Sequence, residues 1–336
     1  MTPWLVTRST CVALLAAWLV AAAPGARAAD APALARAQGA VVGLRTQAVA
    51  NGRTVETLGR EREGSGVVID RDGLVLTIAY LLFEAEEVDL LLPGERVVPA
   101  RVVASDPASG FGLVQPLTRL AVEPAPLGRS ARVTSQETLM IVSGGDEGDS
   151  SLARMVARRA FTGSWEYQIE GALFTAPPRI DHSGAGLFNA AGELVGIGSL
   201  VVTDTLGPGQ PRVPGNMFVP VDLLVPIYDE LRTQGSSRQG HRPWLGLNCV
   251  EQAGQLRVVR VSPGSPAAAA GLLPGDQVSR IDGVAVDALA AFYAALWRDG
   301  SPEREVVLEV RRGDESRSIT LRSADRLKVL RQPQGI

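Results

Sequence analysis

The chain has 336 residues, of which 46% are hydrophobic and 21% are charged, a composition typical of a globular protein with room for two domains. Its formal net charge is −3 at pH 7, and becomes −5 once Arg8 and Arg27 near the N-terminus are set aside. Composition therefore gives no support for a basic face that binds nucleic acid, and we expect no nucleic-acid partner.

The first 28 residues have the features of a secretory signal peptide. Arg8 precedes an apolar run from Cys11 to Ala23, and the small residues Ala26-Arg27-Ala28 follow it. We expect cleavage after Ala28 and a mature chain that is periplasmic or secreted from a bacterium. The run is shorter than the roughly 20 residues that span a bilayer, so an uncleaved membrane anchor is the less favoured alternative and no stable membrane insertion is expected.

Short β-type runs separated by Gly, Asp and Pro predict two small barrels. The runs of the first barrel are 41–44, 66–69, 74–77, 88–92 and 101–104, and those of the second are 138–142, 154–157 and 194–197. A Gly/Pro-rich loop at 203–216 follows. Apolar residues at helical spacing, including Leu223, Ile227 and Leu231, then predict a helix that opens near Met217 and runs to about Thr233.

The segment 181–187, Asp-His-Ser-Gly-Ala-Gly-Leu, places Ser183 among small residues on a tight turn, and a hairpin from Asn189 to Gly192 follows. This arrangement resembles the nucleophile loop of the HtrA/Deg family of trypsin-like serine proteases. The resemblance implies a trypsin-like double β-barrel in which Ser183 holds the nucleophile position. The glycine that the family places two residues before the serine, in the oxyanion loop, is Asp181 here.

Two further stretches resemble the other landmarks of this family. Residues 64–69 and 73–77 are similar to the run that precedes the catalytic histidine, and the histidine position falls on Tyr80. Residues 106–114 are similar to the run that carries the orienting aspartate, and that position falls on Gly110. Two of the three triad positions therefore lack the family's residue.

These substitutions predict an inactive nucleophile position. A serine needs a neighbouring base whose pKa lies near the working pH, whereas a tyrosine has a reference pKa near 10 and stays protonated. Gly110 has no carboxylate, and loss of the base alone costs on the order of a millionfold in turnover in triad proteases. A carboxylate at Asp181 would oppose a developing oxyanion.

No other residue is expected to replace the missing base. The chain has two histidines, and we expect His182 to be a loop side chain and His241 a surface residue. Lys328, the one lysine, lies near the C-terminus. Two isolated histidines and one cysteine of the mature chain do not have metal-ligand spacing, so no metal and no cofactor are expected.

The C-terminal part resembles a PDZ domain of the bacterial protease-associated type. The matching stretches are 244–247 (Trp-Leu-Gly-Leu), 261–267 and 270–278. The resemblance implies that N–H groups of a Gly-containing turn bind a C-terminal carboxylate and that the following strand accepts a peptide strand. The peptide-binding residues would be Leu245, Gly246, Leu247, Asn248, Cys249 and Val250.

Side chains around this segment divide into core and groove. Cys249 alternates with Leu245 and Leu247, which predicts a buried thiol, and without a partner it cannot form an internal disulfide. On the helix that begins near residue 289, Leu289, Phe292 and Leu296 are predicted core residues. Tyr293 and Trp297 lie one step around it, and whether they border the peptide groove stays open.

The predicted organisation is a signal peptide at 1–28, a trypsin-like domain at 29–233, a linker at 234–242, a PDZ domain at 243–325 and a tail at 326–336. The predicted function is that of an HtrA-like pseudoprotease that binds peptides or protein C-termini in envelope protein quality control or regulation. The alternative is a periplasmic serine endopeptidase with a non-standard active site.

HtrA proteins commonly trimerise through aromatic residues near the mature N-terminus. Residues 29–79 contain no Phe, Trp or Tyr, which predicts a monomer or weak oligomer.

Overall fold

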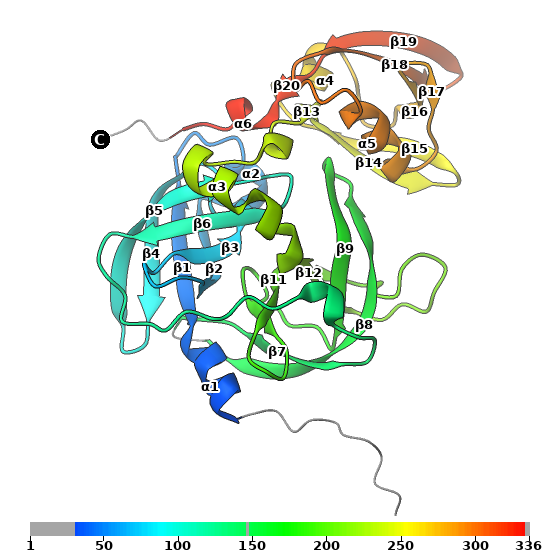
Figure 1. Ribbon diagram of the computed structural model, residues 1–336. Helices are drawn as coiled ribbons and strands as arrows, with labels where there is room; N and C mark the ends of the chain where they lie inside the picture. The colour runs from blue at the N-terminus through cyan, green and yellow to red at the C-terminus, as the bar shows by residue number, and fades with distance from the viewer. Residues whose placement is uncertain (1–30, 146–147, 333–336) are drawn as a thin grey trace, which may run out of the picture.

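The computed structural model describes residues 31–145 and 148–332, so the predicted signal peptide lies outside the described residues. The fold is mostly β, with two closed barrels and a third, separate sheet that packs above them (Figure 1). The predicted fold class is therefore confirmed. Within the described ranges, no helix is long and apolar enough to cross a bilayer.

Six antiparallel strands close the first barrel in the order β1-β2-β3-β6-β5-β4. A short helix, α1 (Ala31–Gly39), precedes it, and α2 (Val55–Leu58) lies between its first two strands. The strands are β1 (Val41–Ala48), β2 (Glu61–Val68), β3 (Val75–Ile78), β4 (Ala85–Leu92), β5 (Arg96–Ser105) and β6 (Phe111–Pro116). Leu76, Ile78 and Phe111 are fully buried in the interior.

Six more strands close the second barrel in the order β10-β11-β12-β9-β8-β7. They are β7 (Thr138–Val142), β8 (Ser150–Gly163), β9 (Tyr167–Ala176), β10 (Gly186–Phe188), β11 (Leu194–Val202) and β12 (Gly215–Pro220). The predicted strand at 154–157 is only the middle of β8. Together β8 and β9 form a long hairpin whose tip, Gly163–Glu166, extends to the third sheet (Figure 1).

The helix predicted from Met217 to Thr233 is wrong in its first half. Met217 belongs to β12, and two single 3-10 turns, η3 (Val221–Leu223) and η4 (Val225–Ile227), precede the α-helix α3 (Tyr228–Gln234). Pro226 lies inside η4, where its missing N–H and its ring disfavour a continuous α-helix. The helix ends at Gly235, whose φ of 80° is the left-handed conformation of a C-terminal cap.

The third unit is a PDZ-like sheet in the order β14-β15-β16-β18-β19, so β14 lies at an edge. Its core includes Leu245, Leu247, Cys249, Phe292 and Leu296. The strands are β14 (Leu247–Gln252), β15 (Gln255–Val261), β16 (Gln277–Ile281), β17 (Val284–Ala285), β18 (Glu305–Arg312) and β19 (Glu315–Arg322), with helices α4 (Pro266–Ala269) and α5 (Leu289–Trp297).

Short polar contacts hold this unit against the barrels. The linker contains η5 (Arg238–Gly240), and Ser237 donates from both its backbone N–H and its hydroxyl to buried Asp106 of the first barrel. Strand β13 (Pro243–Trp244) pairs with β20 (Ala324–Asp325), and α6 (Arg326–Val329) follows. The backbone N–H of Arg331 then donates to Glu84 at 2.8 Å, so the tail returns to the first barrel.

Candidate functional site

Tyr80, at the predicted position of the base, lies beside Ser183. Its hydroxyl oxygen lies 2.8 Å from Ser183 Oγ and 3.0 Å from the carbonyl oxygen of Ser199. Burial raises the pKa of Tyr80 to about 12, although the hydrogen bond to Ser183 opposes this shift. A neutral phenol fixes the serine hydroxyl in place, but it cannot take up the serine proton at neutral pH.

The backbone on both sides of this pair is tightly held. The guanidinium of Arg62 donates to the carbonyl oxygens of Tyr80 and Phe83 at 2.8 and 2.7 Å. The carbonyl oxygen of Ser183 accepts from the N–H of Ser65 at 2.8 Å. Gly184 has a φ of 72°, and a Cβ there would overlap the carbonyl oxygen of Ser65, so only glycine fits this turn.

Gly110, at the predicted position of the orienting acid, has no room for a side chain. Its φ is 80°, and a Cβ built on it would overlap the hydroxyl oxygen of Tyr167. Tyr167 stacks on Trp165 with ring centroids 5.8 Å apart, and Phe161 packs against it edge-on. Tyr167 therefore fills the space that an acid at position 110 would need.

The Tyr167 hydroxyl is itself unusual. It is buried and makes no hydrogen bond of good geometry among the residues that the structure describes, although the side chain of Ser199 lies close enough to oppose the rise of its pKa. Burial raises the pKa of Tyr167, so this phenol too remains protonated. The hydroxyl thus contributes bulk beside Gly110 without a compensating hydrogen bond.

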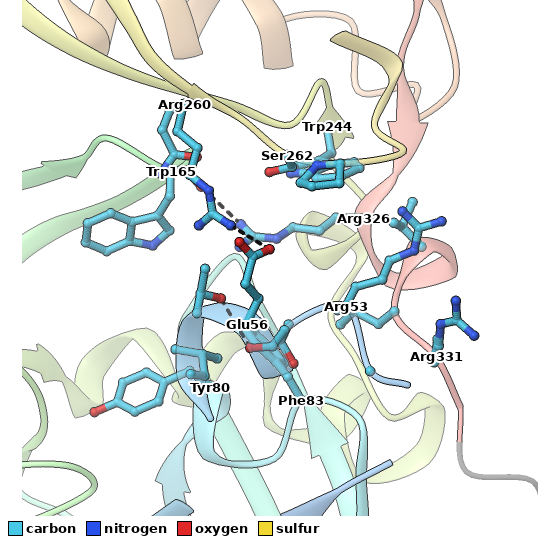
Figure 2. Close-up of a pocket in the computed structure, with 18 of the residues that line it drawn as sticks. Arg53, Glu56, Tyr80, Phe83, Trp165, Trp244, Arg260, Ser262, Arg326 and Arg331 are labelled. Carbon is cyan, nitrogen blue, oxygen red and sulfur yellow. Dashed lines mark hydrogen bonds and ion pairs between the residues drawn. The ribbon is translucent and has the colours of Figure 1, made fainter. Parts of the chain in front are cut away.

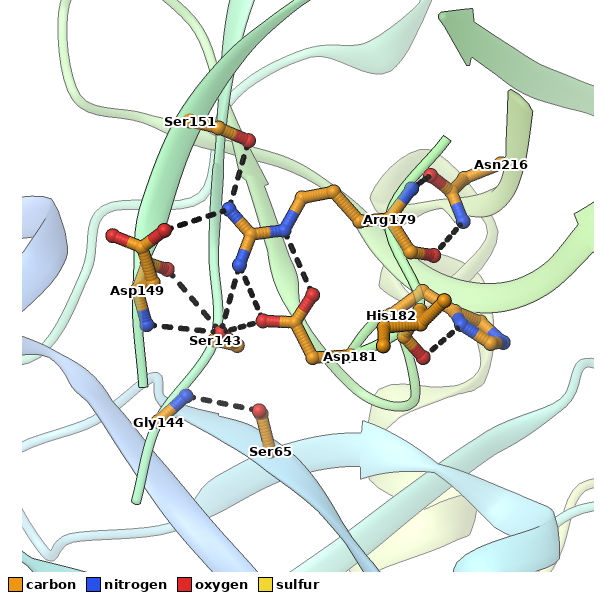
Figure 3. Close-up of polar contacts among 10 residues, drawn as sticks. Ser65, Ser143, Gly144, Asp149, Ser151, Arg179, Asp181, His182 and Asn216 are labelled. Atoms are coloured by element: carbon orange, nitrogen blue, oxygen red, sulfur yellow. Dashed lines mark hydrogen bonds and ion pairs between the residues drawn. The ribbon is translucent and has the colours of Figure 1, made fainter. Parts of the chain in front are cut away.

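The carboxylate of Asp181 is engaged by Arg179 and Ser143 (Figure 3). Its carboxylate accepts hydrogen bonds from the Arg179 guanidinium and from the Ser143 hydroxyl, and the hydrogen bond from Arg179 is the main reason that the pKa of Asp181 is lowered. Arg179 Nη1 also lies 3.7 Å from Asp149 and 2.8 Å from Ser151 Oγ. The predicted repulsion between the Asp181 carboxylate and an oxyanion is therefore weakened, because the Arg179 guanidinium pairs with that carboxylate.

The backbone of this loop also differs from what an oxyanion-binding turn requires. Asp181 is not among the described non-glycine residues with a positive φ, and the left-handed position in the loop is Gly184. A backbone N–H at position 181 therefore lacks the conformational freedom that a glycine would provide. The restriction of the backbone by Asp181 therefore remains, whereas the repulsion between its carboxylate and an oxyanion is largely offset by Arg179.

Neither histidine completes a triad in the described structure. His182 Nδ1 lies 2.8 Å from the carbonyl oxygen of Ile180 within its own loop, and burial lowers the pKa of His182. His241 contacts Asp325 through Nδ1 at 2.7 Å and Ser236 through Nε2 at 3.2 Å. In residues 31–145 and 148–332, no group of three or more His, Cys, Asp and Glu side chains could hold a metal ion.

The predicted carboxylate-binding turn does bind a carboxylate, and that carboxylate belongs to the chain itself. The N–H groups of Leu245, Gly246 and Leu247 donate to the side chain of Glu166 at 3.1, 2.9 and 3.0 Å. Glu166 lies at the tip of the β8–β9 hairpin and is only 5% exposed. Burial raises the pKa of Glu166 to about 7, while the three N–H groups and Arg326 oppose that shift.

The rest of the hairpin tip lies along the predicted peptide groove. The N–H of Cys249 on edge strand β14 donates to the carbonyl oxygen of Ser164 at 3.0 Å. Tyr293 on α5 donates its hydroxyl to Gly163 at 2.7 Å and accepts from the N–H of Glu166 at 2.9 Å. Tyr293 therefore borders the groove. Cys249 is free and buried, and burial raises its pKa to about 12.

A cavity of about 870 Å³ lies between the barrels and the PDZ unit. Tyr80 and His182 are part of its lining, and Glu56 of α2 pairs with Arg260 of β15 at 3.1 Å across it (Figure 2). Arg53, Arg326 and Arg331 also line it, together with Trp165 and Trp244. The pair Tyr80 and Ser183 thus lies beside an interdomain cleft with a strongly basic lining.

The sequence analysis did not predict a role in this site for Glu166, Tyr167 or Arg179. A signal for the first two was present, because Phe161, Trp165 and Tyr167 fall within seven positions of a chain that is only 5% aromatic. Such a cluster at a hairpin tip indicates that the tip is packed against another part of the molecule. Nothing in the local pattern connected Glu166 with residues some 80 positions further along the chain.

Comparisons with known proteins agree with this architecture. Residues 64–197 match the family model of the trypsin-like peptidase domain, and residues 243–322 match that of the PDZ domain. The chain is 25% identical over 296 residues to a probable periplasmic serine endoprotease, DegP-like, of Halomonas elongata, covering 79% of this chain and 57% of that protein. It is 26% identical over 306 residues to the putative serine protease HhoA of Synechocystis, covering 81% and 74%. The chain thus spans little more than half of the DegP-like relative.

Solved structures show the same fold. The HtrA-type protease AlgW with a decapeptide has a TM-score of 0.51 at 21% identity, covering 90% of this chain and 98% of that chain. A serine endoprotease from Yersinia pestis has a TM-score of 0.51 at 20% identity, covering 87% and 96%. At these identities the likeness concerns the order and packing of the elements, and the chemistry of this chain depends on its own residues.

Proposed function

We propose that this chain, which combines a trypsin-like peptidase domain similar to that of DegP-like proteins with one PDZ domain, is a pseudoprotease. In this proposal the barrels are a scaffold without turnover, and the PDZ domain binds peptides or protein C-termini in envelope protein quality control or regulation. The predicted signal peptide and the periplasmic relatives favour a periplasmic location.

The observation that carries the first half is the contact between Tyr80 and Ser183. A phenol with a raised pKa takes the position of the base, and Tyr167 blocks the position of the acid that would orient one. Both losses act on the same proton transfer, so restoring one residue does not restore the triad.

The second half is supported by the turn at Leu245–Leu247. Three N–H groups that converge on one carboxylate are what a C-terminal carboxylate needs, and the edge strand β14 can pair with a peptide backbone. Arginines that line the interdomain cleft favour the approach of a negatively charged chain end. Leu245 and Leu247 line the pocket expected for the last side chain, so an apolar last residue is favoured.

Calorimetry with apolar-ended peptides, each compared with its C-terminal amide, tests the binding proposal. Acid forms should bind and amide forms should bind at least about tenfold more weakly, because the amide loses the charge that the N–H groups stabilise. Equal affinity for both forms would remove carboxylate capture from the account.

The alternative, a serine endopeptidase with a non-standard site, rests on the retained Ser183, which is half-buried and contacts Tyr80 in the lining of the cleft. Incubation of the mature protein with unfolded casein separates the two functions. We expect no hydrolysis above that of the Ser183→Ala variant, whereas serine-dependent cleavage would favour the endopeptidase.

A further inference from the structure

The tip of the β8–β9 hairpin makes the contacts with the PDZ domain that a bound peptide would make. We propose that Gly163–Glu166 is a built-in ligand of this PDZ domain, with Glu166 in place of a C-terminal carboxylate, and that a partner's C-terminus binds by displacing it. This inference rests on the proposed peptide binding and names the feature that controls it.

Four polar contacts define the internal ligand. The side chain of Glu166 accepts from all three N–H groups of the turn, and the carbonyl oxygen of Ser164 accepts from the N–H of Cys249 on the edge strand. Binding of a chain end and addition of a peptide strand are the two halves of PDZ recognition. Here one hairpin provides a part of each.

The hairpin tip is held in place by contacts with the helix α5. Glu166 has a φ of 59°, a left-handed conformation that is uncommon for a non-glycine residue. Tyr293 on α5 contacts the tip at both ends, at Gly163 and at Glu166. The charged group that faces Glu166 from α6 is Arg326, and from β14 the nearby titratable group is the buried thiol of Cys249.

An external peptide has an advantage that the hairpin lacks. Among the described residues, one backbone hydrogen bond joins the hairpin tip to β14, the one between Cys249 and Ser164. An extended peptide can also pair with the strand beyond Cys249, so a sufficiently long ligand gains backbone bonds that the hairpin does not make. Displacement is therefore feasible, at the cost of opening the closed state.

The internal ligand lowers the apparent affinity for every external one. When the competent, open state is a minor fraction of the molecules, the apparent Kd rises by the inverse of that fraction. Because the hairpin is part of the same chain, dilution does not weaken this competition. Removing the Glu166 carboxylate should therefore tighten peptide binding although it adds no contact to the peptide.

The experiment compares the full mature chain with the variants Glu166→Ala and Tyr293→Phe and the control Glu170→Ala. Glu170 is an exposed acid on the same hairpin. Glu170→Ala therefore removes a carboxyl group, as Glu166→Ala does, but not one that contacts the peptide groove. With one apolar-ended acid peptide in calorimetry, Glu166→Ala should lower the apparent Kd by roughly tenfold or more, and Tyr293→Phe by several-fold. Glu170→Ala should leave it unchanged.

Amide hydrogen exchange on the same proteins tests the internal contact without any peptide. In the unmodified chain the amides of 245–247 and 249 should be protected, and in Glu166→Ala they should exchange faster. Fast exchange in the unmodified chain, or equal Kd values for the unmodified chain and Glu166→Ala, would overturn the internal ligand while leaving peptide binding intact. Protection lost in Glu166→Ala without binding of any peptide would instead refute the proposed function and retain the contact.

Discussion

Replacement of Gly110 by alanine is the smallest change that tests why the triad cannot simply be rebuilt. The new methyl group would overlap the hydroxyl oxygen of Tyr167 and lie 3.4 Å from the ring carbon that carries it. The ring cannot swing away freely, because Trp165 stacks on it and Phe161 packs against it. Relief therefore requires movement of the whole aromatic cluster.

The expected cost has two parts. A non-glycine residue in the left-handed conformation costs roughly 1–2 kcal/mol, and overpacking of a well-packed interior costs typically about 1–3 kcal/mol. Gly110→Ala should therefore lower the free energy of unfolding by about 2–5 kcal/mol. Tyr167→Phe removes the overlapping oxygen, which makes no hydrogen bond of good geometry within the described part of the chain, so alone it should be nearly neutral.

The two changes should consequently be non-additive. The double variant should recover the overpacking part, which gives a coupling energy of about 1–3 kcal/mol in a double-mutant cycle. Urea unfolding of the four proteins, followed by tryptophan fluorescence, measures it; Trp165, Trp244 and Trp297 contribute to that signal. Additive costs, or a large loss of stability in Tyr167→Phe alone, would show that Tyr167 does not occupy the space beside Gly110.

Three further outcomes are expected. Gly246→Val should abolish peptide binding, because Gly246 has a φ of 81° and a side chain there would overlap Ser265; Gly254→Val, with a φ of 70° and open space around it, is the matched control, and loss of binding in both would deny a specific role to Gly246. Burial raises the pKa of Glu166 to about 7, so the docked hairpin is most stable below its ordinary pKa of 4.5 and weakens as pH rises through 7. Peptide affinity should thus be higher at pH 8 than at pH 6, and persistence of this trend in Glu166→Ala would assign it to another group. Light scattering at micromolar concentration should give a monomer or weak oligomer, because residues 29–79 lack aromatic anchors, and a stable trimer would contradict this.

The sequence was sufficient for the fold class, because strand runs and glycine turns are local features. The assignment of Tyr80 and Gly110 to triad positions came from the family resemblance and stays a prediction. The Cys249 thiol and the core stripe of α5 followed from periodicity alone. Pro226, which breaks the predicted helix into 3-10 turns, was visible in the sequence but was outweighed by the helical spacing of its neighbours.

The contacts that the sequence did not reveal are long-range. Glu166 reaches the PDZ turn only because the linker and the C-terminal tail hold two units together, and no local pattern encodes that arrangement. The ion pair between Asp181 and Arg179 is more local, since the two residues are two positions apart. It still depends on the loop turning both side chains toward Ser143.

The measurement that tests the central claim most directly is labelling of Ser183 by a fluorophosphonate, read by intact mass. The reagent requires an activated serine, so the mature protein and its Ser183→Ala variant should both remain unlabelled, because Tyr80 keeps its proton and position 110 has no acid. Stoichiometric labelling of the unmodified chain that disappears in Ser183→Ala would show an active nucleophile and contradict the pseudoprotease.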